Sequence, residues 1–143
     1  MAIETKILRP SDVAVLQHLA EGVFADPLDP QATREFLNDP RHHLAVAIVD
    51  GLVVGFASAV HYIHPDKRFP EMWINEVNVA SDYRRRGLGK AVVGALLKLA
   101  REMNCTEAWV LTDKPNTPAI KLYSSLDGIE ATNDGAMFTF FLD

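Results

Sequence analysis

One short stretch of this sequence has residue types and spacing that suit binding of an anion. Residues 84–90 are Arg-Arg-Arg-Gly-Leu-Gly-Lys, and from Leu88 onward apolar residues recur at helical spacing. The two glycines therefore lie where a helix begins, and the first amides of a helix have no acceptor within it. Glycine lets a phosphate approach those amides, and the basic side chains add positive charge. The stretch predicts a phosphate or pyrophosphate site.

The pattern at this turn lacks two common nucleotide-binding motifs and resembles a third. Neither G-x-G-x-x-G nor G-x-x-x-x-G-K-S/T is present. Instead, Arg84-x-x-Gly87-x-Gly89 follows an expected strand that ends at residues 77–79. This pattern resembles the acetyl-CoA signature of the GNAT N-acetyltransferase superfamily. The alternative is a solvated basic helix cap in which Gly87 only eases a tight turn.

A second feature adds to the resemblance. Asn116-x-x-Ala119-x-x-x-Tyr123 stands about 30 residues after the glycine turn. In the family, the asparagine contacts the pantetheine arm and the tyrosine directs its hydroxyl at the thioester sulfur; the alternative for the tyrosine is a core aromatic. The family commonly continues with Gly-Phe, whereas this chain has residues 127–129 as Asp-Gly-Ile, which leaves the end of this last helix uncertain. The resemblance implies that acetyl-CoA contacts Val77, Asn78, Val79, Arg84, Arg85, Arg86, Gly87, Leu88, Gly89, Lys90, Asn116, Ala119 and Tyr123.

Acetyl transfer to an amine makes three demands on such a site. The amine must lose a proton, the tetrahedral oxyanion must be stabilised, and the thiolate must leave. The resemblance implies that backbone amides of residues 77–79 stabilise the oxyanion and that Tyr123 protonates the thiolate. Glu76 is the best-placed base. Its alternative role is to bind a cationic substrate without taking the proton.

Other residues are weaker candidates for the acceptor side of the site. Asn75, adjacent to the candidate base, is expected on the opposite strand face. We expect Asn75 and Asp134, together with Glu76, to contact the substrate. His61 and His64 are alternative bases or relays, because histidine titrates near neutral pH. No metal is expected.

Composition limits the class of protein. The 143 residues are 48% hydrophobic, enough for one domain over residues 1–143, and the net charge is −5. A nucleic-acid binder would usually be basic overall, whereas this chain is acidic. We therefore expect the local basic cluster to bind a small anion. The single cysteine, Cys105, fits a reducing compartment. No apolar run approaches the roughly 20 residues that span a bilayer, and the N-terminus does not resemble a signal peptide, so a cytoplasmic location without a membrane partner is expected.

Periodicity and turn residues predict a mixed α/β (α+β) fold. The expected order is β-α-α-β-β-β-α-β-α-β(β), a mostly antiparallel sheet of 6–7 strands with about four helices, and it again resembles GNAT proteins. Asp50-Gly51 predicts a hairpin turn, Gly55 a bulge or close packing, and residues 61–70 a loop. The expected strands are 3–7, 44–49, 52–62, 72–79, 107–112 and 136–142, and residues 129–132 could add one more. The expected helices are 11–24, 31–37, one that begins at residue 88, and a last one that Thr117 caps and Gly128 ends.

The acceptor is the least determined part of the prediction. Residues 71–79 and 136–143 resemble the small aminoglycoside 3-N-acetyltransferases, which would imply a role in antibiotic resistance. An acidic cleft for a polycation is permitted by Asp26, Asp29, Glu71, Glu76 and Asp134. The expected partner is a small-molecule amine, with no nucleic acid, and a homodimer is left open. Alternatives are acetylation of a protein or peptide amine, and a sensor that binds acetyl-CoA and transfers nothing.

Overall fold

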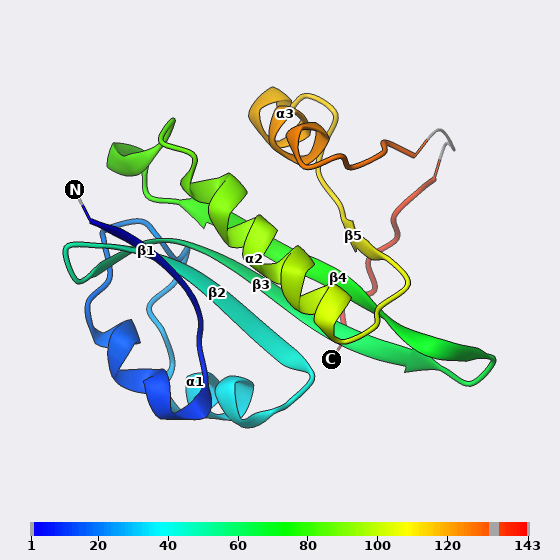
Figure 1. Cartoon of the computed structure of the whole chain (residues 1–143), viewed down its shortest axis with the longest axis horizontal. Helices are drawn as coiled ribbons and strands as arrows, with labels where there is room; N and C mark the ends of the chain where they lie inside the picture. Colours follow the sequence, from blue (N-terminus) through cyan, green and yellow to red (C-terminus); the bar gives the residue numbers. More distant parts are fainter. Residues whose placement is uncertain (1, 132–134, 143) are drawn as a thin grey trace.

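The computed structural model describes residues 2–131 and 135–142, which form one sheet flanked by helices (Figure 1). Within these residues the sheet has five strands in the order β1-β2-β3-β4-β5. The strands are β1 (Ile3–Ile7), β2 (His42–Val49), β3 (Leu52–His64), β4 (Lys67–Val79) and β5 (Ala108–Val110). The helices are α1 (Pro30–Asn38), α2 (Leu88–Glu102) and α3 (Thr117–Ser125), with 3₁₀ helices η1 (Pro10–Gln17) and η2 (Ser81–Tyr83). The mixed α/β fold is as predicted, with fewer strands.

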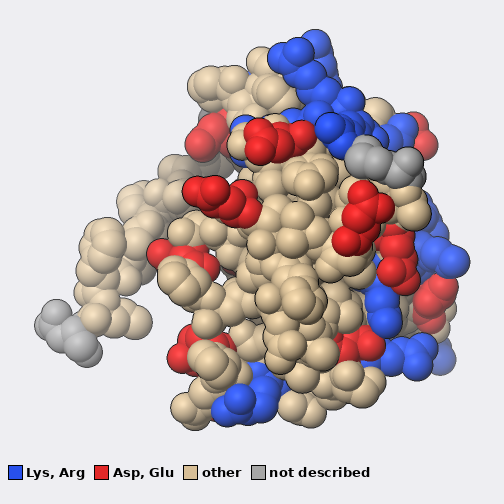
Figure 2. Space-filling model, turned by 90° about the vertical axis from the view of Figure 1, so that its left-hand side faces the viewer, with Lys and Arg blue, Asp and Glu red and all other residues tan. Residues whose placement is uncertain are grey.

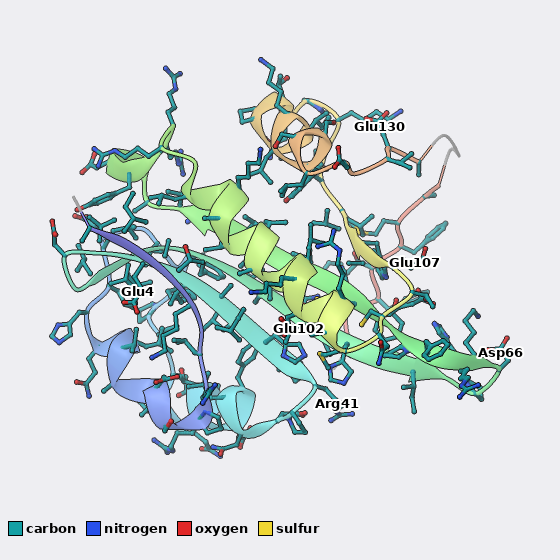
Figure 3. The ribbon with its side chains drawn as sticks, viewed as in Figure 1. Glu4, Arg41, Asp66, Glu102, Glu107 and Glu130 are labelled. Carbon is teal, nitrogen blue, oxygen red and sulfur yellow. The ribbon has the colours of Figure 1, made fainter. Side chains whose placement is uncertain are left out.

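Two hairpins form the centre of the sheet. β1 to β4 are antiparallel neighbours, and β5 joins β4 in parallel. Asp50 and Gly51 both have positive φ in the tight turn, which confirms the first hairpin. The prediction of a loop over residues 61–70 is wrong. β3 and β4 extend through these residues and form a second hairpin, with Asp66 at its tip (Figure 3). Its ring and charged side chains pair across the strands, as in Tyr62 opposite Glu71, so they need no loop to reach solvent.

Three register shifts interrupt the long strands; one lies between Tyr62 and His64 near the hairpin tip, and the other two concern Gly55 and Asn75. The first of these two lies between Ala47 and Ile48, opposite Gly55, where a Cβ would come within 3.2 Å of Val79 Cγ2. Both the bulge and the close packing expected at Gly55 are therefore confirmed. The second shift leaves Asn75 without a partner on β3, because Ser58 pairs with Glu76 and Ala59 with Ile74. This second bulge lies in the predicted site.

Helices cover both sheet faces. The buried side of α2 packs Val92, Val93 and Leu96 on one face, and each such side chain contributes about 1.5–3 kcal/mol. On the other face α1 and η1 pack next to β2. The helix expected to run to residue 24 ends at Gln17 as a 3₁₀ helix. Its continuation pairs instead with β3, where Val53 N–H donates to His18 O and Ala20 N–H donates to Val53 O.

The C-terminal part departs most from the prediction. α3 begins after Asn116, which caps it in place of the expected Thr117. The predictions of strands at 136–142 and at 129–132 are wrong for the residues that the structure describes there, because 129–131 and 135–142 have no regular secondary structure. No residue of 135–142 makes a backbone hydrogen bond to another described residue, so a strand there lacks its partner. Among the described residues, no helix is long and apolar enough to cross a membrane.

Candidate active site

The main cleft opens where β4 and β5 separate. The two strands pair only over Met72–Ile74 and Ala108–Val110, while β4 continues to Val79. The edge of β4 beyond Ile74 therefore faces a cleft of about 1250 Å³ instead of another strand. The cleft is closed by the glycine turn, the start of α2 and one side of α3. Residues 75–79 therefore have an edge with no strand partner on the β5 side.

The glycine turn presents backbone amides to this cleft. Gly87 caps α2 in the left-handed region with φ of 76°, a conformation that favours glycine. Ala91 N–H donates to Gly87 O at 3.0 Å, so the amides of Leu88, Gly89 and Lys90 precede the first hydrogen bond of the helix. These three residues line the cleft. The amides that the sequence analysis expected to bind an anion thus belong to residues of the cleft wall.

Gly89 has a second role, in packing. A Cβ at this position would lie 2.7 Å from Leu122 Cδ1. Glycine therefore lets α3 approach the first turn of α2 closely, which narrows the cleft between the two helices.

The basic side chains divide between the cleft and the turn itself. Arg84, Arg85 and Lys90 line the cleft, but Arg84 Nε donates to Val79 O at 3.0 Å and so also fixes the turn to the end of β4. Arg86 does not line the cleft: its guanidinium lies 5.3 Å from the ring centre of Tyr83. Figure 2 shows Lys and Arg side chains gathered at the upper end of the molecule, where this turn lies. One basic residue of the cleft, Lys121, was missed by the sequence analysis.

The first turn of α3 brings two predicted residues to the cleft. Asn116 Oδ1 accepts a hydrogen bond from Ala119 N–H at 3.2 Å, so the spacing that resembles the family motif is also that of a helix cap. Asn78, expected on the cofactor, donates its side-chain amide to Gly22 O and Val23 O at 3.0 and 2.8 Å. Only the remaining groups of these two asparagines, including their backbone, are left for a ligand.

Tyr123 lies half-buried in the wall of the cleft. Burial raises the pKa of its hydroxyl above the usual 10, so the group holds its proton at neutral pH. Residues 127 and 128, which differ from the usual family pattern, cap the end of α3. Gly128 N–H donates to Tyr123 O and Asp127 N–H donates to Ser124 O, and Asp127 has φ of 67°. The departure from the family pattern therefore does not disturb the tyrosine.

Glu76 occupies the junction of two cavities. It is exposed and lines both the main cleft and a second pocket of about 300 Å³ under the η1–α1 segment. The bulge at Asn75 interrupts the alternation of β4, and Asn75 and Glu76 both line the main cleft. The expectation that Asn75 faces away from Glu76 is therefore not met.

The second pocket is apolar with an acidic rim. Phe24, Phe36 and Phe56 are among its apolar residues, and Asp26 and Asp29 join Glu76 as its carboxylates. Its wall includes residues 25–29, the segment between η1 and α1, which carries no motif that would have predicted a binding role. Asp29 also caps α1, since it accepts from Ala32 N–H at 2.7 Å.

Three other predicted candidates lie elsewhere. His61 Nδ1 is 2.8 Å from His43 Nε2, and His64 Nε2 is 3.0 Å from Glu71 Oε2; none of these residues lines either cavity. Glu71 is buried and also accepts a hydrogen bond from Tyr62. Asp134, expected to bind substrate, lies outside the described residues.

Sequence comparison identifies the family. The model of the Acetyltransferase (GNAT) family matches residues 13–127, and the chain belongs to this family. It is 28% identical over 105 residues to rat N-acetyltransferase 8, 30% over 95 residues to an aminoglycoside N(6')-acetyltransferase type 1 of Salmonella typhimurium, and 32% over 124 residues to a mycothiol acetyltransferase of Salinispora arenicola. These matches cover 73%, 63% and 81% of this chain, but only 47%, 65% and 38% of the relatives.

Solved structures share the fold of this chain. An aminoglycoside acetyltransferase from an uncultured soil metagenomic sample, HMB0005, superposes with a TM-score of 0.83 at 22% identity and full coverage of both chains. AAC(6')-Iy in complex with the bisubstrate analog CoA-S-monomethyl-acetylneamine superposes with a TM-score of 0.78 at 20% identity, covering 99% of this chain and all of the other. At these identities the likeness shows the fold.

Proposed function

We propose that this chain is an acetyl-CoA-dependent N-acetyltransferase whose acceptor is a primary amine of a small cationic molecule. The observation that carries the proposal is the position of Glu76, where the cleft that suits acetyl-CoA meets a pocket with an acidic rim. A carboxylate at this junction can attract an ammonium group and also take its proton. The family assignment and the CoA-bound neighbours support acetyl-CoA as the donor.

In this proposal the pyrophosphate of acetyl-CoA lies over the glycine turn. The amides of Leu88, Gly89 and Lys90 donate to it, with the dipole of α2 and the charges of Arg85 and Lys90 in support. The pantetheine arm then runs along the free edge of β4. Backbone N–H groups alternate along the strand, and Ala80 N–H donates to Val54 O on β3, so the amides of Val77 and Val79 are the ones that face the free edge and the thioester carbonyl.

The proposed reaction is direct transfer. The ammonium gives a proton to Glu76, directly or through a water, and the free amine attacks the thioester carbonyl carbon. The C–N bond forms, and the β4 amides stabilise the oxyanion. When the C–S bond breaks, the thiolate of CoA takes the proton held by Tyr123, whose raised pKa keeps it protonated until that step. The attacking nitrogen then gives up its second proton through water to the Tyr123 phenolate, which leaves a neutral amide and restores the tyrosine.

The acceptor class follows from the second pocket. Asp26, Asp29 and Glu76 attract a polycation, while the apolar wall suits sugar or alkyl surfaces. An aminoglycoside fits this description and is what several relatives and neighbours act on or bind by name. The sequence analysis favoured the 3-amine, whereas the aminoglycoside relatives are of the 6' type. The position of the amine is therefore left to experiment.

A panel of amines tests the proposal. The protein is incubated with acetyl-CoA and aminoglycosides that carry or lack the 3- or 6'-amine, polyamines, and a peptide with a free N-terminus, and CoA release is measured. We expect the highest kcat/KM with an aminoglycoside. Preference for the peptide would reassign the acceptor to protein amines, and tight acetyl-CoA binding without transfer to any amine would favour the sensor.

A further inference from the structure

The hydroxyl of Ser58 is a polar group in the middle of the core. Ser58 lies on β3 and is the only residue of the segment 52–60 with a polar side chain. It is 7% exposed, and its side chain makes no hydrogen bond to any residue that the structure describes. Burying a hydroxyl without a partner costs stability, so packing alone does not explain a serine at this position.

The surroundings of Ser58 point to a ligand. Ser58 lines the second pocket, as does Phe56, two residues earlier on the same strand face. The ring of Phe56 stacks on Phe24 with centres 4.2 Å apart, so this face of β3 is the one that η1 and α1 cover. The sheet contributes only two polar side chains to the described wall of this pocket, those of Ser58 and Glu76.

Ser58 and Glu76 are direct neighbours across β3 and β4. They form the regular pair beside the bulge at Asn75, and the Cβ atoms of such partners lie about 4.5–5.5 Å apart on one face. Bulges beside a site change the direction in which the neighbouring side chains point. A ligand group held by Ser58 would therefore lie only one or two carbon atoms away from a group held by Glu76.

We propose that Ser58 determines which amines the protein accepts, because its hydroxyl binds a second polar group close to the reacting amine. That group is a hydroxyl or an amine on the adjacent carbon or the next one, since a serine hydroxyl can both donate and accept. The inference rests on the proposed function, in which Glu76 holds the reacting amine. An acceptor without the second polar group leaves Ser58 buried and unpaired, which is how a polar site rejects an analogue.

The size of the pocket limits the part of the acceptor that enters it. Its volume of about 300 Å³ is at the lower end of the range of about 300–1,000 Å³ for small-molecule sites. The pocket therefore suits one ring or one short chain, and its aromatic residues suit the carbon face of a ring.

A pair of amines that differ in one hydroxyl tests the selection. The hydroxyl-bearing amine is trans-2-aminocyclohexanol, and cyclohexylamine lacks the hydroxyl. CoA release gives kcat/KM for each amine with the unaltered protein and with Ser58→Ala. We expect the ratio of the two kcat/KM values, aminocyclohexanol over cyclohexylamine, to fall roughly tenfold in Ser58→Ala. Comparing ratios between proteins cancels the difference in basicity between the two amines.

Thr33→Val is the matched control. It removes a hydroxyl from the α1 side of the same pocket, away from Glu76, and should leave the ratio unchanged. An unchanged ratio in Ser58→Ala would overturn the proposal. An equal loss of activity with both amines would also overturn it, because the hydroxyl would then act on Glu76 and not on the acceptor.

Binding without turnover separates this proposal from the proposed function. Ligand-observed NMR titrations without acetyl-CoA should show that the unaltered protein binds aminocyclohexanol more tightly than cyclohexylamine, and that Ser58→Ala loses this difference. If no amine is acetylated but the difference depends on Ser58, the proposed reaction fails and the binding role of Ser58 stands. If amines are acetylated but Ser58→Ala keeps the difference, the proposed reaction stands and the role of Ser58 fails.

Stability distinguishes a ligand-binding hydroxyl from a structural one. Ser58→Ala should keep or raise the free energy of unfolding in urea, because it removes a buried hydroxyl that has no partner in the described fold. A marked loss of stability would show that the hydroxyl supports the fold and would overturn the proposal.

Discussion

At the scale of single residues, Tyr123 carries the most specific chemical prediction. Tyr123→Phe should lower kcat about 100-fold, within the usual range for an acid catalyst, because no group then protonates the departing thiolate. Binding of acetyl-CoA, measured by calorimetry, should change by less than about threefold. Tyr83→Phe is the control, since this second tyrosine of the cleft should tolerate loss of its hydroxyl. A raised KM with normal kcat would assign the Tyr123 hydroxyl to ground-state binding.

His43 carries a prediction about pH and stability. Burial, and then the neighbouring His61, lowers the pKa of His43 from 6.5 to about 4. Between these pH values the unfolded chain binds more protons than the folded one, so the free energy of unfolding should fall as pH drops from 6.5 to 4. Urea titrations should show this fall, and His43→Gln should flatten it.

Of the other groups with shifted pKa values, His61 also acts in that pH window, whereas Asp12 and Asp39 do not. The lowered pKa values of Asp12 and Asp39 move their effect to pH below 3.8, while His61 shifts in the same direction as His43. A slope that is unchanged in His43→Gln, with His61 intact, would show that His43 is not the group responsible.

Sequence patterns predicted which residues line the site. They did not predict the hydrogen bonds and ring contacts that each side chain makes there. Nearly all the predicted cofactor residues reach the cleft, because they lie on one strand end and two helix starts. The hydrogen bonds of Asn78, Arg84 and Asn116 to backbone atoms could not be foreseen, since they depend on loop conformations. The contact of the Arg86 guanidinium with the Tyr83 ring could not be foreseen either, because it also depends on the conformation of the turn.

At the scale of elements, the end of α3 offers a test of backbone strain. Asp127 adopts φ of 67° in the C-terminal cap, a region that costs a residue with a Cβ roughly 1 kcal/mol relative to glycine. Asp127→Gly should therefore stabilise the protein by about 1 kcal/mol. Gly128→Ala should destabilise it, because a Cβ would lie 2.8 Å from Tyr123 O. Equal stabilities in urea would contradict this account of the cap.

The start of α2 offers the matching test of function. Gly87→Val should lower acetyl-CoA affinity at least tenfold, because the turn can no longer present its amides in the same conformation. Gly51→Val is matched to it, since Gly51 has φ of 80° against 76° and lies in the β2–β3 turn away from the cleft. Both variants should lose stability, and only the first should lose affinity. Unchanged acetyl-CoA binding in Gly87→Val would place the anion site elsewhere.

Local patterns predicted the elements that local forces determine. The 3.6-residue period of α2 and the Asp50-Gly51 turn needed no tertiary information, and both were correct. The β3–β4 hairpin was missed because its residues at 61–70 gain strand geometry only from cross-strand pairing. The early end of η1 has the same origin, since residues 18–20 bond to Val53.

At the scale of the whole molecule, function depends on how two structural halves meet. α2, α3 and the glycine turn form the cleft on one side of β4, and the η1–α1 segment forms the acidic pocket. The bulge at Asn75 places Glu76 at their meeting point. This arrangement was not predictable from spacing along β4, because the bulge changes which residues share a face.

The central claim is that Glu76 takes the proton of the acceptor amine, and the pH dependence of Glu76→Gln tests it most directly. Glu76→Gln should lower kcat/KM about 100-fold at neutral pH and recover partly at higher pH, where free amine is present. Asp26→Asn, a control in the same pocket, should raise the KM for the amine and leave kcat unchanged. A Glu76→Gln enzyme with unchanged kcat and a raised KM would limit Glu76 to substrate binding, and unchanged kcat/KM across the pH range would contradict the account.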